Sequence, residues 1–182
     1  MKKLLIPLLF LFLFFHLPAD AHPHLFIEPG ISFVEERGAL RAVNIRWVWD
    51  EFWSEDVMLE CDVDGNGSLS ASEMKLVKKE FFDGVEDFGY FFMMKSDGQS
   101  IKFGAAKNFT VKMTGEGRLI YEFTLETKTP VIPKNKLELF FFDKTIYTAF
   151  DPTVSITGGR LPLQKKKFEP YSDYGVKMTL AK

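Results

Sequence analysis

The segment His24–Asp50 reads HLFIEPGISFVEERGALRAVNIRWVWD and contains the clearest indication of the fold in the chain. Apolar and polar residues alternate on both sides of Arg37-Gly38, and Val, Ile, Phe and Trp are frequent. Residues of these types suit a half-buried pleated strand, and Arg-Gly can form the turn between two strands. The segment therefore predicts a β-hairpin with strands over 24–36 and 39–50.

Similar strand patterns recur from Tyr90 to the C-terminus, separated by Gly, Asp, Asn and Pro. Short strands at this spacing are typical of an antiparallel sandwich or open barrel, so we expect a mainly β domain. The expected strands are YFFMMK (90–95), SIKF (100–103), KNFTVKM (107–113), RLIYEFTLET (118–127), KLELFFF (136–142), IYTAF (146–150), TVSIT (153–157) and GVKMTL (175–180).

Between the hairpin and these strands, the apolar spacing changes to that of a helix. One set of residues recurs at i, i+4 and i+8, and a second set at i, i+3 and i+7, so each set lies on one helical face. The sets are Trp53, Val57 and Cys61, and Met74, Val77 and Phe81. We therefore expect a helix–loop–helix insertion at about 51–83, which makes the domain α+β overall.

The loop between the two expected helices reads DVDGNGSLSASE, from Asp62 to Glu73. An EF-hand calcium loop takes oxygen ligands at positions 1, 3, 5, 7, 9 and 12 and has a glycine at position 6. The ligand positions hold Asp62, Asp64, Asn66, the backbone carbonyl of Ser68, Ser70 and Glu73, and position 6 holds Gly67. A polar turn is the alternative, since Asp, Asn and Gly are frequent in turns. Turn chemistry does not require the glutamate, so the pattern favours a calcium site.

The first 21 residues, MKKLLIPLLFLFLFFHLPADA, have the layout of a secretory signal peptide. Lys2 and Lys3 precede an apolar run over 4–17, and Ala19-Asp20-Ala21 supplies the small residues of a cleavage site. The run is shorter than the roughly 20 residues of a membrane-spanning helix, which leaves an uncleaved anchor as the minor alternative. We expect a single exported, periplasmic domain over 22–182, with no membrane span after cleavage.

Composition excludes several classes of partner. The expected mature chain has 21 Lys and Arg (23 − 2) and 24 Asp and Glu (25 − 1), a net charge of −3. This balance predicts binding neither to nucleic acid nor to an anionic membrane surface. The basic run Lys165–Lys167 is expected to be a solvated stretch. Cys61 is the single cysteine, so no intrachain disulfide can form.

Two histidines stand at the expected new N-terminus, in HPHLF. After cleavage, the amino group and imidazole of His22 could chelate a transition metal, and His24 would face the same side of a strand. Such ligands suit copper, nickel or zinc better than calcium. The alternative is that HPH is a polar leader to the first strand. We keep His22 and His24 as candidate transition-metal ligands.

Candidate catalytic residues are absent from the sequence pattern. Residues 22–182 contain no further histidine that could act as a base for a serine or cysteine nucleophile. The carboxylates of WDEFWSED (49–56) are expected at the start of an exposed helix, where its dipole stabilises them. Cys61 is expected to be a small buried apolar residue. We therefore expect a protein that is not an enzyme.

Several motifs, taken together and in order, resemble the family DUF1007. They are AHPHLFIE (21–28), WVWDEFWS (47–54), the loop DVDGNGSLSASE, YFFMMKSDG (90–98), FGAAKNF (103–109) and LELFFFDKTIYTAF (137–150). The resemblance implies an exported bacterial protein that serves a nickel or cobalt transport system, with an inner-membrane metal permease as partner. His22 and His24 match the HPH start of that family. The alternative function is a calcium-ordered protein-interaction module with no transition-metal role.

Overall fold

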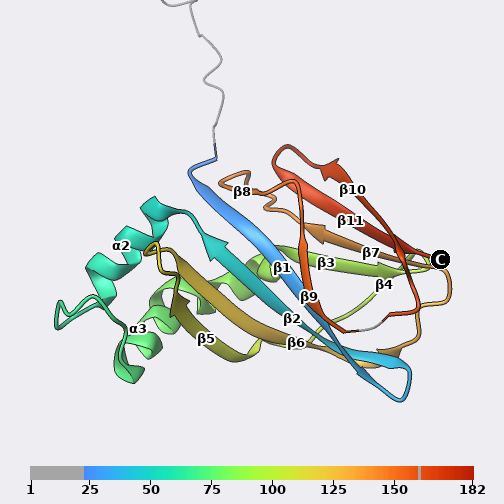
Figure 1. The fold of residues 1–182 in the computed structure, drawn as a ribbon, viewed down its shortest axis with the longest axis horizontal. Coiled ribbons are helices and arrows are strands. Elements are labelled where there is room, and N and C mark those ends of the chain that lie inside the picture. The colour runs from blue at the N-terminus through green and yellow to red at the C-terminus, as the bar shows by residue number, and fades with distance from the viewer. Residues whose placement is uncertain (1–22, 160) are drawn as a thin grey trace, which may run out of the picture.

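The computed structural model describes residues 23–159 and 161–182. The expected signal peptide and His22 lie outside these ranges. Within them, strands predominate and form two sheets, with a pair of helices at one end of the molecule (Figure 1). The mainly β prediction is therefore confirmed, and the described strands form no closed barrel.

The first sheet is built on the hairpin predicted from His24–Asp50. Its strands pair with Ile27 opposite Trp49 and Ile31 opposite Ile45, which places alternate side chains in the core. The sheet order is β5-β6-β2-β1-β8, and β9 also pairs with β1. The elements are β1 (Leu25–Glu36), β2 (Ala39–Trp49), β5 (Lys107–Met113), β6 (Leu119–Val131), β8 (Thr148–Phe150) and β9 (Ser155–Gly158).

Two pairings in this sheet correct the expectation of a purely antiparallel fold. Strand β1 is parallel to both β8 and β9. A parallel partner cannot be reached through a tight turn, so the chain returns to β1 only after a long excursion. The first sheet is therefore mixed.

The second sheet is antiparallel, in the order β10-β11-β7-β3-β4. The elements are β3 (Phe92–Ser96), β4 (Gln99–Ser100), β7 (Lys136–Phe141), β10 (Lys165–Tyr171) and β11 (Gly175–Ala181). Strand β10 was not predicted, although the exposure expected for Lys165–Lys167 is confirmed. It lies at the sheet edge, where lysines and Pro170 discourage pairing with another chain.

Helices occupy the expected insertion. Helix α2 (Glu51–Cys61) and helix α3 (Ala71–Phe81) flank the loop, and a 3₁₀ segment, η1 (Asp83–Phe91), follows. The strand expected from Tyr90 begins instead at Phe92, because Gly89, Tyr90 and Phe91 have φ values of 64°, 55° and 50°. Three successive residues in the left-handed conformation cannot form part of a strand. No helix of the described ranges is long and apolar enough to cross a membrane.

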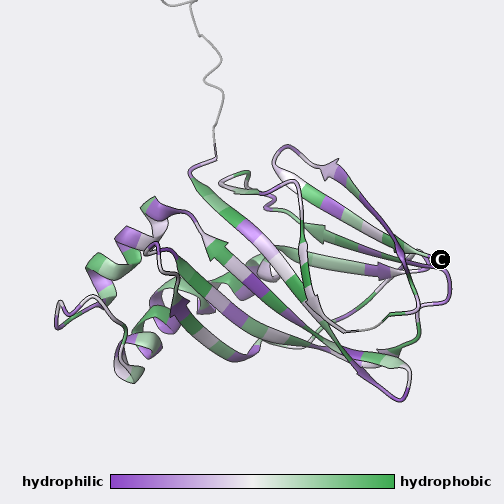
Figure 2. Cartoon of the chain, in the orientation of Figure 1, coloured by the Kyte–Doolittle hydropathy of each residue, from purple (hydrophilic) through white to green (hydrophobic). Residues whose placement is uncertain are grey.

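One hydrophobic core takes side chains from both sheets and from the helices. Green and purple alternate along the strands in Figure 2, as expected where one face of a sheet is buried. Trp47 is fully buried, and its ring lies 4.8 Å from Phe123 and 5.7 Å from Phe91. Buried side chains join both helices to this core: Val57 and Cys61 from α2, and Val77 from α3.

Candidate metal centre

The loop Asp62–Glu73 is held between two capped helices. Ser70 caps α3 by accepting a hydrogen bond from the amide of Glu73, and the Glu73 carboxylate accepts one from the amide of Ser70 at 2.7 Å. This reciprocal capping box fixes where the second helix begins. Leu69, within the loop, is partly buried and packs against the hydrophobic core.

Three carboxylates converge inside this loop. Ligand oxygens of Asp62, Asp64 and Glu73 all lie within 4.8 Å of one another. Asp62 and Asp64 turn inward because their side chains accept backbone hydrogen bonds, from Asn66 at 3.1 Å in both cases. Asp62 also accepts the amide of Gly67 at 2.7 Å. The backbone thus wraps around the acidic oxygens.

Glycine supplies the backbone conformation that this wrapping needs at position 6. Gly67 has a φ of +78°, in the left-handed region, where a side chain would be strained. The amide of the next residue, Ser68, donates to the Asn66 side chain at 2.8 Å and continues the turn. The sequence pattern placed glycine at this position for the same reason.

Glu73 ties the two ends of the loop together. It is buried, and its carboxylate accepts the amide of Val63 at 2.8 Å as well as that of Ser70. Hydrogen bonds from Ser70, and further ones from Val63 and Asp64, hold the pKa of Glu73 below its ordinary value. The carboxylate therefore stays ionised to a lower pH than that of an ordinary glutamate.

The donor chemistry of the loop fits a hard cation. Its ligand positions present carboxylate, amide, hydroxyl and backbone carbonyl oxygens, and calcium takes six to eight oxygens. A carboxylate oxygen can accept an N–H bond and bind a cation at once, since it has two lone pairs. Oε2 of Glu73 accepts one amide, from Ser70, and so keeps a lone pair for a cation. Oε1 accepts the amides of Val63 at 2.8 Å and Asp64 at 3.4 Å, so a cation bound through both oxygens would replace the longer of these two bonds.

The candidate transition-metal ligands are less well defined. The backbone amide of His24 donates to the Tyr147 carbonyl at 2.9 Å, and the two rings lie 5.0 Å apart. Among the residues that the structure describes, no close trio of imidazole, thiol or carboxylate ligands includes His24. Its expected partner, His22, lies outside those residues.

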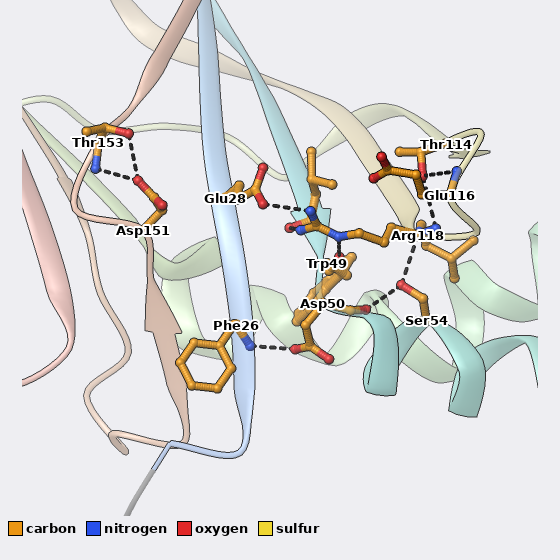
Figure 3. Close-up of polar contacts among 12 residues, drawn as sticks. Phe26, Glu28, Trp49, Asp50, Ser54, Thr114, Glu116, Arg118, Asp151 and Thr153 are labelled. Atoms are coloured by element: carbon orange, nitrogen blue, oxygen red, sulfur yellow. Dashed lines mark hydrogen bonds and ion pairs between the residues drawn. The ribbon is translucent and has the colours of Figure 1, made fainter.

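A polar junction beside His24 joins β1, β2 and α2 (Figure 3). Asp50 caps α2 by accepting the amide of Trp53 at 2.8 Å, and it also accepts the amide of Phe26 at 2.6 Å. Arg118 donates to the Trp49 carbonyl at 2.7 Å and to Glu28 at 2.6 Å. These bonds hold together one wall of a pocket of about 630 Å³.

Cys61 is buried at the end of α2, as its position on the apolar face predicted. Burial, followed by the nearby charges of Glu60, Glu80 and Glu73, raises the pKa of its thiol. A thiol in this environment stays protonated and is a poor nucleophile.

Taken together, the fold and the loop define a class of protein: a mainly β domain of two sheets with an acidic helix–loop–helix insertion after its first hairpin. The chain belongs to the family described as "Protein of unknown function (DUF1007)", whose family model matches residues 7–173. The resemblance read from the sequence motifs is thereby confirmed.

One relative is described as "Uncharacterized 15.5 kDa protein in trpE 3'region" of Spirochaeta aurantia. It is 23% identical to this chain over 92 residues, which cover 50% of this chain. The match spans 65% of the length of that relative, a little less than two thirds.

Proposed function

We propose that this protein binds calcium through Asp62–Glu73 and acts as a non-catalytic, exported accessory of a metal transport system. The observation that carries the calcium proposal is the convergence of three carboxylates within 4.8 Å. Like charges this close repel one another, and a divalent cation between them removes the repulsion. Asn66, Ser68 and Ser70 would complete the oxygen set.

The site is proposed to act as a clamp. Both flanking helices pack on the core through Val57 and Val77, so a cation held by the loop would fix one helix relative to the other. A single loop in an exported protein can work with a Kd on the order of 10⁻⁴ to 10⁻³ M, because extracellular modules bind calcium in that range.

Calcium is expected to raise the thermal stability of the mature protein. Binding to the native state alone adds about 2.7 kcal/mol at a hundredfold excess over Kd. For a chain of this size, that corresponds to a rise in Tm of roughly 5–10 °C. The measurement is a thermal melt in EDTA and in calcium chloride, with magnesium chloride as the matched control. An unchanged Tm, together with no heat in a calcium titration, would overturn the proposal.

The transport role is proposed from the family resemblance and from HPH. If His22 and His24 hold nickel, cobalt, copper or zinc, His22→Ala combined with His24→Ala will abolish that binding and leave calcium binding intact. Calorimetric titration of the chelator-stripped mature protein with each metal measures both. Unchanged transition-metal binding in the double variant would remove the histidines from the proposal.

A second candidate function, a calcium-ordered interaction module, is favoured by one surface of the insertion. Phe52, Leu59 and Val63 are 79%, 85% and 76% exposed. Phe52 and Leu59 are seven residues apart and so lie on one face of α2, and Val63 follows in the loop. Solvent-exposed apolar side chains aligned on one face are typical of a docking surface. Calcium binding without any transition-metal binding would favour this second candidate.

A further inference from the structure

A second pocket lies where the helical insertion meets the first sheet. It has a volume of about 370 Å³ and takes residues from β1, β2, α2, α3, η1 and the turn before β8. This size suits a small ligand, since such sites are commonly about 300–1,000 Å³. The pocket is separate from the metal loop, since Asp62–Glu73 contributes none of its lining residues.

Aromatic residues are six of the thirteen that line this pocket. The lining rings are Trp49, Trp53, Phe81, Phe88, Phe91 and Tyr147. The Trp53 ring lies 5.2 Å from that of Trp49 and 5.5 Å from that of Phe81, so these three rings contact one another in sequence. The Phe88 and Phe91 rings form a second pair, 6.1 Å apart. Phe88 and Tyr147 are each about half exposed. The π-face of an aromatic ring carries partial negative charge and attracts cations.

The charge of the pocket is also negative. Only Glu80 and Asp143 among its lining residues are charged at neutral pH. Glu80 is paired with the neighbouring Lys79. Asp143 is buried and accepts hydrogen bonds from Thr145 and Thr148, but it forms no ion pair with any described residue. A buried carboxylate without a cationic partner is complementary to a cationic ligand.

The backbone around the pocket is strained on two sides. Ile146, in the turn that positions Tyr147, has a φ of 56°, which is unusual for a β-branched residue. On the other side, Tyr90 and Phe91 have φ values of 55° and 50°. Strained backbone persists where the surrounding structure enforces it, and it is concentrated at ligand sites. Here it brings aromatic side chains from distant segments to one place.

We propose that this pocket binds a small organic cation with a methylated ammonium group. The rings of Trp53, Phe88 and Tyr147 would surround the methyl groups, and Asp143 would balance the charge. Quaternary ammonium suits such a site because it is bulky, weakly hydrated and unable to donate hydrogen bonds. The proposal does not depend on calcium binding by the loop.

The test is calorimetric titration with choline chloride, alongside its neutral isostere 3,3-dimethylbutan-1-ol. Choline is expected to bind saturably, and the isostere about tenfold more weakly or not at all, because it lacks the charge. Asp143→Asn is expected to weaken choline binding by about tenfold or more. Equal affinity for both compounds, or no saturable binding of choline, contradicts the proposal.

If the Asp143→Asn variant fails to fold, substitutions of the aromatic rings still test whether the pocket binds choline. Phe88→Leu and Tyr147→Leu remove a ring but retain an apolar side chain at half-exposed positions. Each is expected to weaken choline binding by several fold, on the order of one cation–π contact. Phe52→Leu is the matched control, since Phe52 is exposed and lies outside this pocket. Unchanged affinity in both pocket variants overturns the proposal.

Discussion

Glu73→Gln is expected to lower calcium affinity by about 100-fold or more. The change removes the buried carboxylate that lies within 4.8 Å of both Asp62 and Asp64 and would bind the cation through two oxygens. Calcium affinity depends strongly on the charge and number of ligands, so an uncharged amide is a poor replacement. Calorimetric titration of the purified variant measures the effect.

The same substitution has a second, smaller consequence without calcium. Glutamine keeps one accepting oxygen, but its amide nitrogen replaces the other. It therefore cannot accept both the amide of Ser70, which Glu73 receives at Oε2, and those of Val63 and Asp64, which it receives at Oε1. Loss of the capping box is expected to cost about 1 kcal/mol of stability in EDTA. Glu55→Gln, an equal change of charge at an exposed position on α2, is the control. Equal calcium affinity in both variants would show that the loop is only a turn.

Trp47→Ala is expected to destabilise the protein by about 3–5 kcal/mol, the usual cost of truncating a fully buried aromatic side chain. The Trp47 ring contacts Trp49, Phe82, Phe91 and Phe123, so its removal leaves a cavity that rigid neighbours cannot fill. Urea denaturation, followed by circular dichroism, measures the loss as a lower midpoint.

A matched substitution separates packing from hydrogen bonding at this position. The indole nitrogen of Trp47 has no hydrogen-bond partner among the described residues. Trp47→Phe therefore gives up no hydrogen bond and is expected to cost clearly less than Trp47→Ala. Phe52→Ala, at a position that is 79% exposed, is expected to change stability by less than about 0.5 kcal/mol. If Trp47→Phe lowered stability as much as Trp47→Ala, the loss would come from features that only the indole has, and not from the packing of an aromatic ring at this position.

Local periodicity predicted the parts of the fold that local physics decides. The hairpin of 24–50 and the two helices of the insertion formed as expected, because burial of one face imposes a period of two on a strand and 3.6 on a helix. Val57, Cys61 and Val77 are buried, as their helical spacing indicated. The EF-hand pattern expects glycine at position 6, and Gly67 at that position has a positive φ.

Features set by distant parts of the chain were not predictable in this way. The parallel partners of β1 lie more than 100 residues away, and no local pattern encodes that pairing. Strand β10 reads KKKFEPY and was missed because an exposed edge strand lacks strong apolar alternation. Tyr90 and Phe91 looked like strand residues by type, but the left-handed backbone at the end of η1 overrides that preference.

The two candidate sites, the acidic loop and the aromatic pocket, also differ in how far local sequence could predict them. The acidic loop is contiguous in sequence, so its ligand spacing could be read directly, and the structure brings Asp62, Asp64 and Glu73 together. The aromatic pocket is assembled from segments as distant as Leu25 and Thr148. The abundance of phenylalanine, 20 residues, indicated an aromatic core but not which rings would meet. The packing of α2, α3 and η1 against the first sheet determines that.

The parallel pairing of β1 also governs when folding can finish. Leu25 pairs with Thr148, a separation of 123 residues (148 − 25), so the first sheet is incomplete until most of the chain has been synthesised. Contacts between such distant segments form slowly, because a long loop must close before they are made. The hairpin of β1 and β2 can form early, but the edge of β1 that receives β8 and β9 stays open meanwhile. A polypeptide with this order of assembly completes its first sheet only after the segment that carries β8 and β9 has been made.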